Sequence, residues 1–398
     1  MSISLLSFFV VYSSVFGVGY SYMIRLIRKG PQEDEPTIPP TGTPARPLSA
    51  AVLDSQPEGT PLMGIDLSVI WFVIIVFATL MYIVMDGFDL GIGILFPAIT
   101  DADDRDVMVN SVAPVWDGNE TWLVLGGAGL FGAFPLAYAV IVDALTIPLT
   151  LMLIGLIFRG VAFEFRFKAT PAHRPFWDKA FLGGSILATF TQGIVVGAVL
   201  NGFSVTGRSY SGGPFDWLTP FTLFCGVGLV VAYALLGATW LVMKSENPLQ
   251  DKMRCVARKL LLAMLVVIAI ISLWTPLAHS AIAERWFSLP NLWFLMPVPL
   301  LVALISLWLW RSLGQQNSHT LPFVLTLGLI FLGFSGLGIS IWPHIIPPSI
   351  TLWQAAAPAQ SQGFMLVGAL LIIPIILVYT FWSYYVFRGK VQHGEGYH

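Results

Sequence analysis

Charged residues are scarce in this chain of 398 residues. Only 11% of the residues are Asp, Glu, Lys or Arg, whereas 56% are hydrophobic, and the mean hydropathy is +0.78. This balance excludes a soluble globular protein and predicts an all-α polytopic membrane protein. The formal net charge of −2 offers no basic surface for phosphates, so nucleic-acid binding is excluded as well.

Cysteine and histidine are also rare. Two cysteines do not make a disulfide scaffold or a metal cluster. Haem iron in a membrane protein generally needs axial His or Met from inside the helix bundle. The histidines lie in expected loops, at helix ends or in the tail, at His173, His279, His319, His344, His393 and His398. We therefore expect this chain to bind no haem or metal itself.

Ten apolar stretches are long enough, at about 20 residues, to cross a bilayer as helices. They cover residues 3–24, 67–96, 117–137, 139–165, 179–203, 219–243, 259–278, 291–310, 320–342 and 364–387. We expect a nine-helix transmembrane bundle preceded by one extra N-terminal transmembrane helix. The expected divisions are residues 1–30 for the extra helix, 31–62 for a disordered linker rich in Pro and Thr, and 63–398 for the nine-helix domain.

The distribution of Lys and Arg orients the nine helices. If the helix at 67–96 begins outside, the segments expected inside are 97–116, 166–178, 244–258, 311–319 and 388–398. Together with the helix edges, these segments hold Arg105, Arg166, Lys168, Arg174, Lys179, Lys244, Lys252, Arg254, Arg258, Lys259, Arg311, Arg388 and Lys390. The outside loops hold only Arg208 and Arg285, so the C-terminus is expected in the cytoplasm.

The first apolar run conflicts with this orientation. It ends in Arg25, Arg28 and Lys29, which favour the inside, yet the next helix must begin outside. One interpretation is that residues 1–62 belong to a neighbouring gene product. They would then be joined to this chain by a genomic fusion, or by a translation start that is wrongly assigned upstream of Met63. Another is a tenth helix that is inserted against a weak charge rule. A cleaved signal peptide fits least, because the n-region lacks positive charge.

Carboxylates recur in the inner half of three successive expected helices. The ionisable residues that converge there are Asp86, Asp89, Asp117, Glu120, Arg159, Glu164 and Arg166. A charge in hydrocarbon costs about 2.5–3.5 kcal/mol, so such groups normally pair or line a wet path. Arg159 could neutralise one or two acids and fasten the helices together. Four acids and only one intramembrane Arg leave a surplus of negative charge, however, and this surplus favours a proton entrance.

Small and polar residues inside the expected helices have simpler interpretations. Gly87, Gly91 and Gly93 offer surfaces on which helices pack closely. Gln192, in the middle of the helix at 179–203, is a candidate for a buried interhelical hydrogen bond or for a quinone contact. We favour the hydrogen bond.

Three motifs carry a resemblance to a known family. They are "MDGFDLGIGIL" at 85–95, "NSVAPVWDGNETWLV" at 110–124 and "LIFRGVAFEFRFK" at 156–168. In this order and spacing they resemble subunit II of the cytochrome bd quinol oxidases, with the cyanide-insensitive branch as a candidate. The resemblance covers residues 63–398. Residues 4–31 resemble the last helix and cytoplasmic end of subunit I of the same complex, in agreement with the conflict in orientation.

The resemblance implies a subunit of an electrogenic quinol:oxygen oxidoreductase that reduces dioxygen to water without pumping protons. It implies a multi-pass location in the bacterial cytoplasmic (inner) membrane. Subunit I would carry haems b and d and the quinol site, so this chain would have no catalytic residue and would be inactive alone. Some members of the family hold a structural quinone in subunit II. The sequence leaves open whether this one does, and whether a small third subunit is present.

The resemblance also implies roles for the acids. Asp117 is expected to admit protons from the cytoplasm, with Glu120, Asp86 and Asp89 as its neighbours on the pathway. The residues expected to support this charge network are Trp116, Asn119, Arg159, Glu164 and Arg166.

Two other functions stay open from the residues alone. In an ion-coupled transporter the acids would form the ion site, but transporters often show broken helices in repeated halves. Here the acids lie only in the first three helices of the bundle. In a purely structural scaffold subunit they would have no role in proton transfer.

Overall fold

The computed structural model describes residues 66–246, 248–392 and 394. The extra helix expected at 1–30 and the linker expected at 31–62 lie outside the described residues. The described part is almost entirely helical. Its helices are α3 (Leu67–Ile94), η1 (Phe96–Ala98), α4 (Ala102–Asn110), α5 (Trp116–Ala133), α6 (Pro135–Ala144), α7 (Thr146–Lys168), α8 (Arg174–Asn201), α9 (Pro220–Lys244), α10 (Leu249–Ala278), α11 (Ser280–Phe287), α12 (Asn291–Leu295), α13 (Pro297–Ser312), α14 (Leu321–Ile341), α15 (Leu352–Ala355) and α16 (Ala359–Val386).

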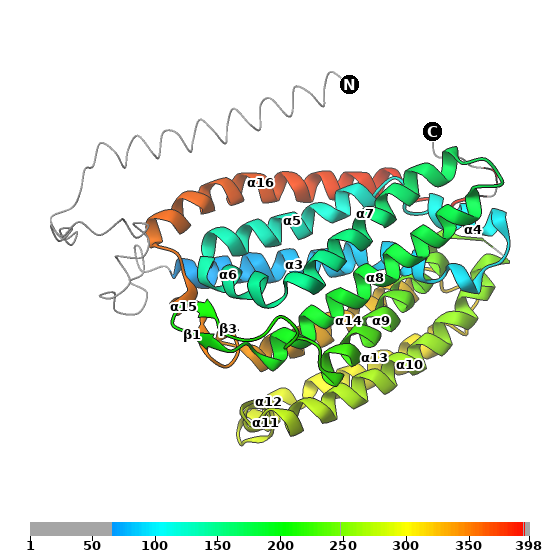
Figure 1. Ribbon diagram of the computed structural model, residues 1–398. Coiled ribbons are helices and arrows are strands. Elements are labelled where there is room, and N and C mark those ends of the chain that lie inside the picture. The colour runs from blue at the N-terminus through cyan, green and yellow to red at the C-terminus, as the bar shows by residue number, and fades with distance from the viewer. Residues whose placement is uncertain (1–65, 247, 393, 395–398) are drawn as a thin grey trace, which may run out of the picture.

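The long helices run side by side in one elongated bundle (Figure 1). Helices α8 and α9 lie at its centre, and α3 packs against both. Helices α10, α13 and α16 lie at the periphery and expose most of their apolar surface. One end of the bundle, which we call the hairpin end, carries α6, α15 and two short antiparallel hairpins, β1 (Val205–Thr206) with β2 (Ser209–Tyr210) and β3 (His344–Ile346) with β4 (Ile350–Thr351). The opposite end carries α4 and is called the α4 end.

Nine membrane spans fit the described residues. Eight spans consist of helices long and apolar enough to cross a bilayer, with α12 and α13 counted together, and the bent pair α5–α6 supplies the ninth. This agrees with the all-helical nine-span expectation for the domain. The chain is therefore an integral membrane protein.

The boundaries expected at 117–137 and 139–165 are wrong. Helix α5 ends at Ala133, the chain bends by 118° into α6, and α7 begins only at Thr146. The bend lies at Phe134, whose φ of −133° and ψ of 64° are not helical. Pro135 disfavours a helical conformation in the residue before it and suits the first position of a new helix. The apolar run continues through the bend, so hydropathy alone does not reveal it.

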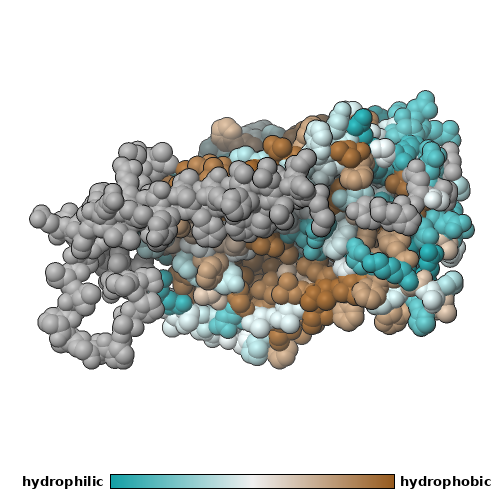
Figure 2. All heavy atoms as spheres, turned by 90° about the horizontal axis from the view of Figure 1, so that it is seen from above, coloured by the Kyte–Doolittle hydropathy of each residue, from teal (hydrophilic) through white to brown (hydrophobic). Residues whose placement is uncertain are grey.

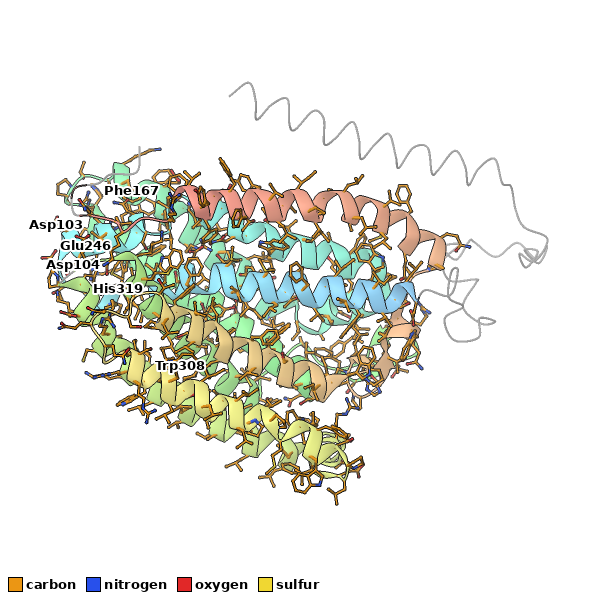
Figure 3. All side chains as sticks on the ribbon, turned by 180° about the vertical axis from the view of Figure 1, so that it is seen from behind. Asp103, Asp104, Phe167, Glu246, Trp308 and His319 are labelled. Atoms are coloured by element: carbon orange, nitrogen blue, oxygen red, sulfur yellow. The ribbon has the colours of Figure 1, made fainter. Side chains whose placement is uncertain are left out.

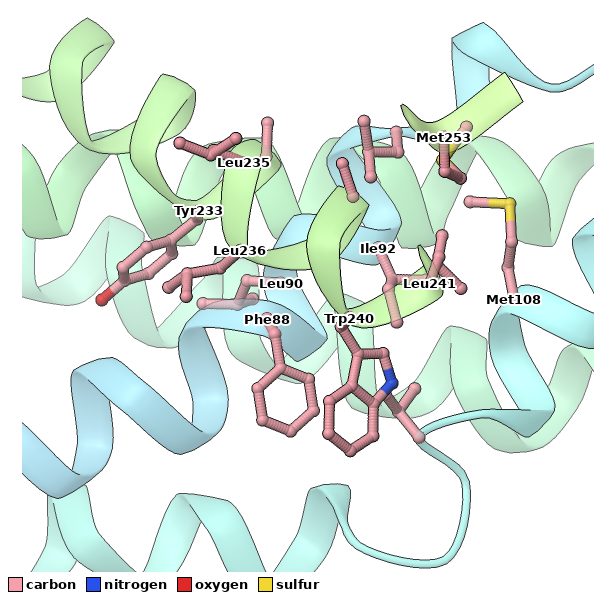
Figure 4. Close-up of a cluster of buried hydrophobic side chains, with 14 of the residues drawn as sticks. Phe88, Leu90, Ile92, Met108, Tyr233, Leu235, Leu236, Trp240, Leu241 and Met253 are labelled. Atoms are coloured by element: carbon pink, nitrogen blue, oxygen red, sulfur yellow. The ribbon is translucent and has the colours of Figure 1, made fainter. Parts of the chain in front are cut away.

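Close contact between α3 and α9 fixes the centre of the bundle. A Cβ atom at Gly91 would overlap the carbonyl oxygen of Tyr233, so only glycine allows the two backbones to approach this closely. Nearby, the rings of Phe88 and Trp240 stack with centroids 4.1 Å apart (Figure 4). These contacts hold the half of α3 that carries the acids against the most deeply buried helix.

The surface separates by polarity along the bundle. Hydrophilic residues gather at the α4 end, whereas the middle of the visible surface is largely apolar (Figure 2). Asp103, Glu246 and His319 lie at this polar end, and the exposed Trp308 lies along the side of the bundle (Figure 3). This is the pattern of a protein whose sides face lipid and whose end faces water.

Candidate functional site

A buried ion cluster joins α3, α5 and α7 in the half of the bundle near the α4 end. Arg159 of α7 is fully buried and pairs with Asp86 of α3, which is also fully buried. The same guanidinium lies 3.1 Å from Oε1 of Glu120 on α5, whose side chain is 31% exposed. One cation thus joins α3, α5 and α7, as the pairing interpretation of the sequence expects.

A hydrogen-bond chain adjoins this cluster through Asp89, one helical turn after Asp86. Nδ2 of Asn119 donates to Oδ2 of Asp89 at 2.7 Å and lies 3.2 Å from the carbonyl oxygen of Met85. The hydroxyl of Tyr384, on α16, donates to Oδ1 of Asn119 at 3.0 Å. Both Asp89 and Asn119 are about 1% exposed. The second acid of the "MDGFD" motif is therefore held by the WDGN motif and by the last helix.

Trp116 forms an apolar wall of the cluster. The guanidinium carbon of Arg159 lies 5.5 Å from the centroid of its ring, within the range of a cation–π interaction. The same ring stacks on Phe163 with centroids 5.2 Å apart. Trp116 thus packs against both the guanidinium and Phe163.

The cluster has more negative than positive groups. The guanidinium of Arg159 pairs with two carboxylates, those of Asp86 and Glu120. A third carboxylate, that of Asp89, lies one helical turn after Asp86 and accepts from Asn119 instead. Full ionisation of all three would leave net negative charge in a low-dielectric site, which is costly. Within the described part of the chain, Oδ2 of Asp86 and Oδ1 of Asp89 are buried and have no hydrogen-bond partner. An arrangement of this kind can take up protons and exchange them through water.

Asp117 and Glu164 lie outside the cluster. Both side chains are exposed, and neither forms an ion pair with any residue that the structure describes. Asp117 is in the first turn of α5, three residues before Glu120, and so lies on the same side of that helix. Asp117 and Glu120 of α5 and Asp86 of α3 thus form a series of decreasing exposure.

Arg166 belongs to a second network instead. Its guanidinium contacts Asp106 of α4 and Asp178 of α8, each at 2.6 Å. Asp178 also pairs with Arg105 at 2.8 Å. This network connects α4 to the ends of α7 and α8. Arg166 therefore does not support the Arg159 cluster directly.

Gln192 forms the interhelical hydrogen bond that was one of its two interpretations. Its Nε2 donates to the hydroxyl of Tyr82 at 2.7 Å, and both residues are buried. The bond joins α8 to α3 one turn before Asp86.

Sequence reasoning missed several partners in these networks. Tyr384 was missed because it follows Asn119 by 265 positions and has no charge to draw attention to it. Asp106 and Asp178 lie in the polar segments that the sequence predicts as inside loops, where a carboxylate is ordinary, whereas the structure places them on α4 and α8. Only the fold shows that they face Arg166.

The described histidines are not placed inside the bundle, where a haem would meet them. No group of three or more His, Cys, Asp or Glu among them is arranged to hold a metal. The histidines that the structure describes, at positions 173, 279, 319 and 344, all lie outside the membrane-spanning helices. An axial histidine for a haem within the bundle would have to come from inside a helix, and no described histidine lies there.

Comparison with known proteins gives consistent matches. The family model described as "Cytochrome bd terminal oxidase subunit II" matches residues 67–387. The chain is 30% identical to cytochrome bd-I ubiquinol oxidase subunit 2 of Escherichia coli, over 81% of this chain and 94% of that protein. It is 26% identical to cytochrome bd ubiquinol oxidase subunit 2 of Bacillus subtilis, over 82% of this chain and 97% of that protein. Its fold resembles the solved bd oxidase of Geobacillus thermodenitrificans, with a TM-score of 0.62, 19% identity, and coverage of 79% of this chain and 97% of that one.

Proposed function

Because the chain belongs to the family of cytochrome bd terminal oxidase subunit II, we propose that it serves as subunit II of a quinol oxidase. In this proposal a partner, subunit I, carries haems b and d and the quinol site, and dioxygen is reduced there to water. No described histidine lies inside a membrane-spanning helix, which supports this division of labour. This chain alone would then be inactive, and its own contribution would be assembly and a route for protons.

The series of acids with decreasing exposure carries the proton-route proposal. Asp117 is exposed at the α4 end, Glu120 is 31% exposed at its side chain, and Asp86 is fully buried. In this proposal Asp117 receives protons from water, and Glu120 and Asp86 pass them inward beside Arg159. Pairing with the guanidinium of Arg159 compensates only part of the negative charge of these carboxylates. A purely structural role therefore does not explain why the cluster has more carboxylates than cations.

An exposed stripe on α5 supports a protein partner. Asp117, Thr121, Val124, Ala128 and Phe131 are all exposed and recur every three or four residues. A carboxylate facing outward from a membrane helix is unfavourable against lipid but acceptable against another protein. The small Ala128 in this stripe allows a neighbouring helix to approach closely. Subunit I is the partner that we propose for this face. Asp117, in the first turn of α5, would then lie at the edge of the interface that faces water.

The orientation proposed from the sequence assigns the α4 end to the cytoplasm. Helix α4, which holds Arg105, lies at this end, as do the first turns of α8 and α10, which hold Arg174 and Lys252. This agrees with the excess of Lys and Arg on the inner side of membrane proteins. The C-terminus would also be cytoplasmic. Protons for water formation would then come from the inside, in a bacterial cytoplasmic membrane.

The proposal is tested on the whole complex, purified through a tag on this chain. Wild type should retain a haem-bearing partner in fixed ratio and take up oxygen in the presence of quinol. Asp117→Asn cannot exchange a proton and should slow oxygen uptake about tenfold, which equals roughly 1.4 kcal/mol of barrier, while haem content stays normal. Asp103→Asn is the matched control, because it removes an exposed carboxylate of α4 at the same end, and it should leave uptake unchanged.

Either of two results would contradict the proposal. If the tagged wild-type chain purifies without any haem-bearing partner, the assignment to an oxidase complex fails and an ion-coupled transporter becomes the better reading. If Asp117→Asn keeps full oxygen uptake, the chain is an assembly subunit and the acids hold helices together.

A further inference from the structure

A pocket of about 420 Å³ lies at the α4 end. It lies between the ends of α9 and α16 and the segment that joins α4 to α5, and its lining includes Ser111, Trp240 and Tyr384. Trp240 also packs against Phe88 in the core (Figure 4). This side of the pocket is therefore held by the central helices. Its volume falls within the range of small-molecule binding sites.

The charged side chains that line this pocket are both cationic. Lys244 is the last residue of α9 and is 7% exposed, whereas Lys390 follows α16 and is exposed. No carboxylate lines the pocket in the part of the chain that the structure describes. Nor does any described carboxylate lie within ion-pair distance of Lys244. The pocket thus offers positive charge without a counter-ion from the described chain.

The ammonium group of Lys244 is held by two hydrogen bonds and has a third N–H donor. Its ammonium group donates to the carbonyl oxygens of Phe387 and Gly389, and it lies 5.2 Å from the centroid of the Trp240 ring. An ammonium group has three N–H donors. Two are used by these carbonyls, so one remains for an acceptor in the pocket.

Aromatic residues at the end of α16 indicate the depth of the pocket. Trp382, Tyr385 and Phe387 are exposed on the last turns of this helix, and the guanidinium of Arg388 lies 4.2 Å from the centroid of the Tyr385 ring. Trp and Tyr are enriched where a membrane protein crosses from hydrocarbon to headgroups. Hydrophilic residues gather at the same end of the bundle (Figure 2). The pocket therefore lies at the level of lipid headgroups.

We propose that this pocket binds the phosphate group of an anionic phospholipid. Basic pockets between membrane helices are suited to anionic headgroups, since buried ammonium groups and phosphate oxygens complement each other. Trp240 and Phe387 supply apolar surface for the glycerol unit next to the phosphate. Free phosphate offers the same oxygens but no group that would contact this apolar surface, so a lipid fits the whole pocket better. Tyr384 lines this pocket and also donates to Asn119, so the pocket adjoins the hydrogen-bond chain of Asp89.

The test measures lipid binding to the delipidated, purified complex by native mass spectrometry. Phosphatidylglycerol should bind at least about fivefold more tightly than phosphatidylcholine. Lys390→Gln should weaken phosphatidylglycerol binding about fivefold, as expected for one cation near a headgroup. Lys390 is chosen because it is exposed beyond α16, whereas Lys244 caps the carbonyls there and its loss could disturb folding. Lys259→Gln, an exposed lysine of α10, is the control and should bind as wild type does.

Three results would overturn the proposal. The first is equal affinity for phosphatidylglycerol and phosphatidylcholine. The second is an unchanged affinity in Lys390→Gln, or the same loss in Lys259→Gln. The third is displacement of the lipid by an equal concentration of inorganic phosphate, which would assign the pocket to free phosphate instead.

Discussion

Arg159 is fully buried and contacts carboxylates from two other helices. Removing one partner of a buried ion pair leaves the other charge uncompensated, at a cost of about 3–5 kcal/mol. We expect Arg159→Gln to lower the yield and the thermal stability of the assembled complex. The double variant Arg159→Gln with Asp86→Asn should recover much of the stability, because it removes the stranded charge. Thermal melts of the purified complexes measure both effects, and equal melting temperatures for the single and double variants would contradict them.

His319 lies in the loop between α13 and α14 and is expected to make stability depend on pH. Burial, with the positive charges of Lys390 and Arg254, lowers the pKa of His319 from its ordinary value of 6.5. Its Nδ1 lies 3.0 Å from the amide nitrogen of Gln250, which donates to the neutral ring. As the pH falls through 6.5, the unfolded chain takes up a proton at this position while the folded chain does not. The free energy of unfolding therefore falls below pH 6.5.

This pH dependence can be checked by thermal melts at pH 7.5 and pH 5.5. The drop in melting temperature should be smaller in His319→Asn than in wild type, because Asn does not titrate. His173→Asn, which alters an exposed histidine before α8, should keep the full drop. A drop of the same size in all three proteins would show that His319 contributes nothing.

The residues that sequence analysis brought together were those with charge. Asp86, Glu120 and Arg159 could be expected to meet because an unpaired charge is costly in a membrane and few partners are available. The same reasoning grouped Arg166 with them, although it lies near the polar end, where acids of α4 and α8 are closer. Tyr384 could not be foreseen, since an uncharged residue far along the chain gives no signal. The proton-transfer roles of the acids stay predictions.

At the scale of elements, the contact of α3 with α9 depends on a glycine. Gly91→Ala would overlap the backbone of Tyr233 and lies close to the backbone nitrogen of Gly237. We expect it to destabilise the protein by about 1–3 kcal/mol or more. Gly183→Ala is the matched control, because a Cβ there meets no atom within 4 Å and should be neutral or slightly stabilising in a helix. Melting temperatures of the two variants give the comparison, and an equally stable Gly91→Ala would refute the close approach.

Most elements could be predicted because a membrane helix must be long and apolar. Nine spans were expected in the domain and nine fit the described residues. The exception is the region from α5 to α7, where one continuous apolar stretch contains a sharp bend at Phe134 and Pro135. Hydropathy measures transfer into lipid, and it does not record backbone angles. Pro135 was the available sign of a helix break in this stretch. The prediction followed the length of the apolar run instead and placed a continuous helix there.

In the whole molecule, apolar and charged surfaces lie at different places along the bundle. The apolar sides and the exposed stripe on α5 suit lipid and a partner subunit, whereas the charges gather toward the α4 end. The Arg159 cluster lies between these regions, one helix turn or more inside the polar end. In the proposed function this position allows protons to pass from water toward the partner without a haem in this chain.

The central claim is that Asp117 admits protons to the oxidase, and time-resolved proton uptake tests it most directly. The fully reduced complex, in weakly buffered solution with a pH indicator dye, is mixed with oxygen, and proton uptake is followed beside haem oxidation. We expect Asp117→Asn to delay proton uptake about tenfold relative to wild type and to Asp103→Asn, with the haem spectrum unchanged. Proton uptake as fast as in wild type would contradict the account.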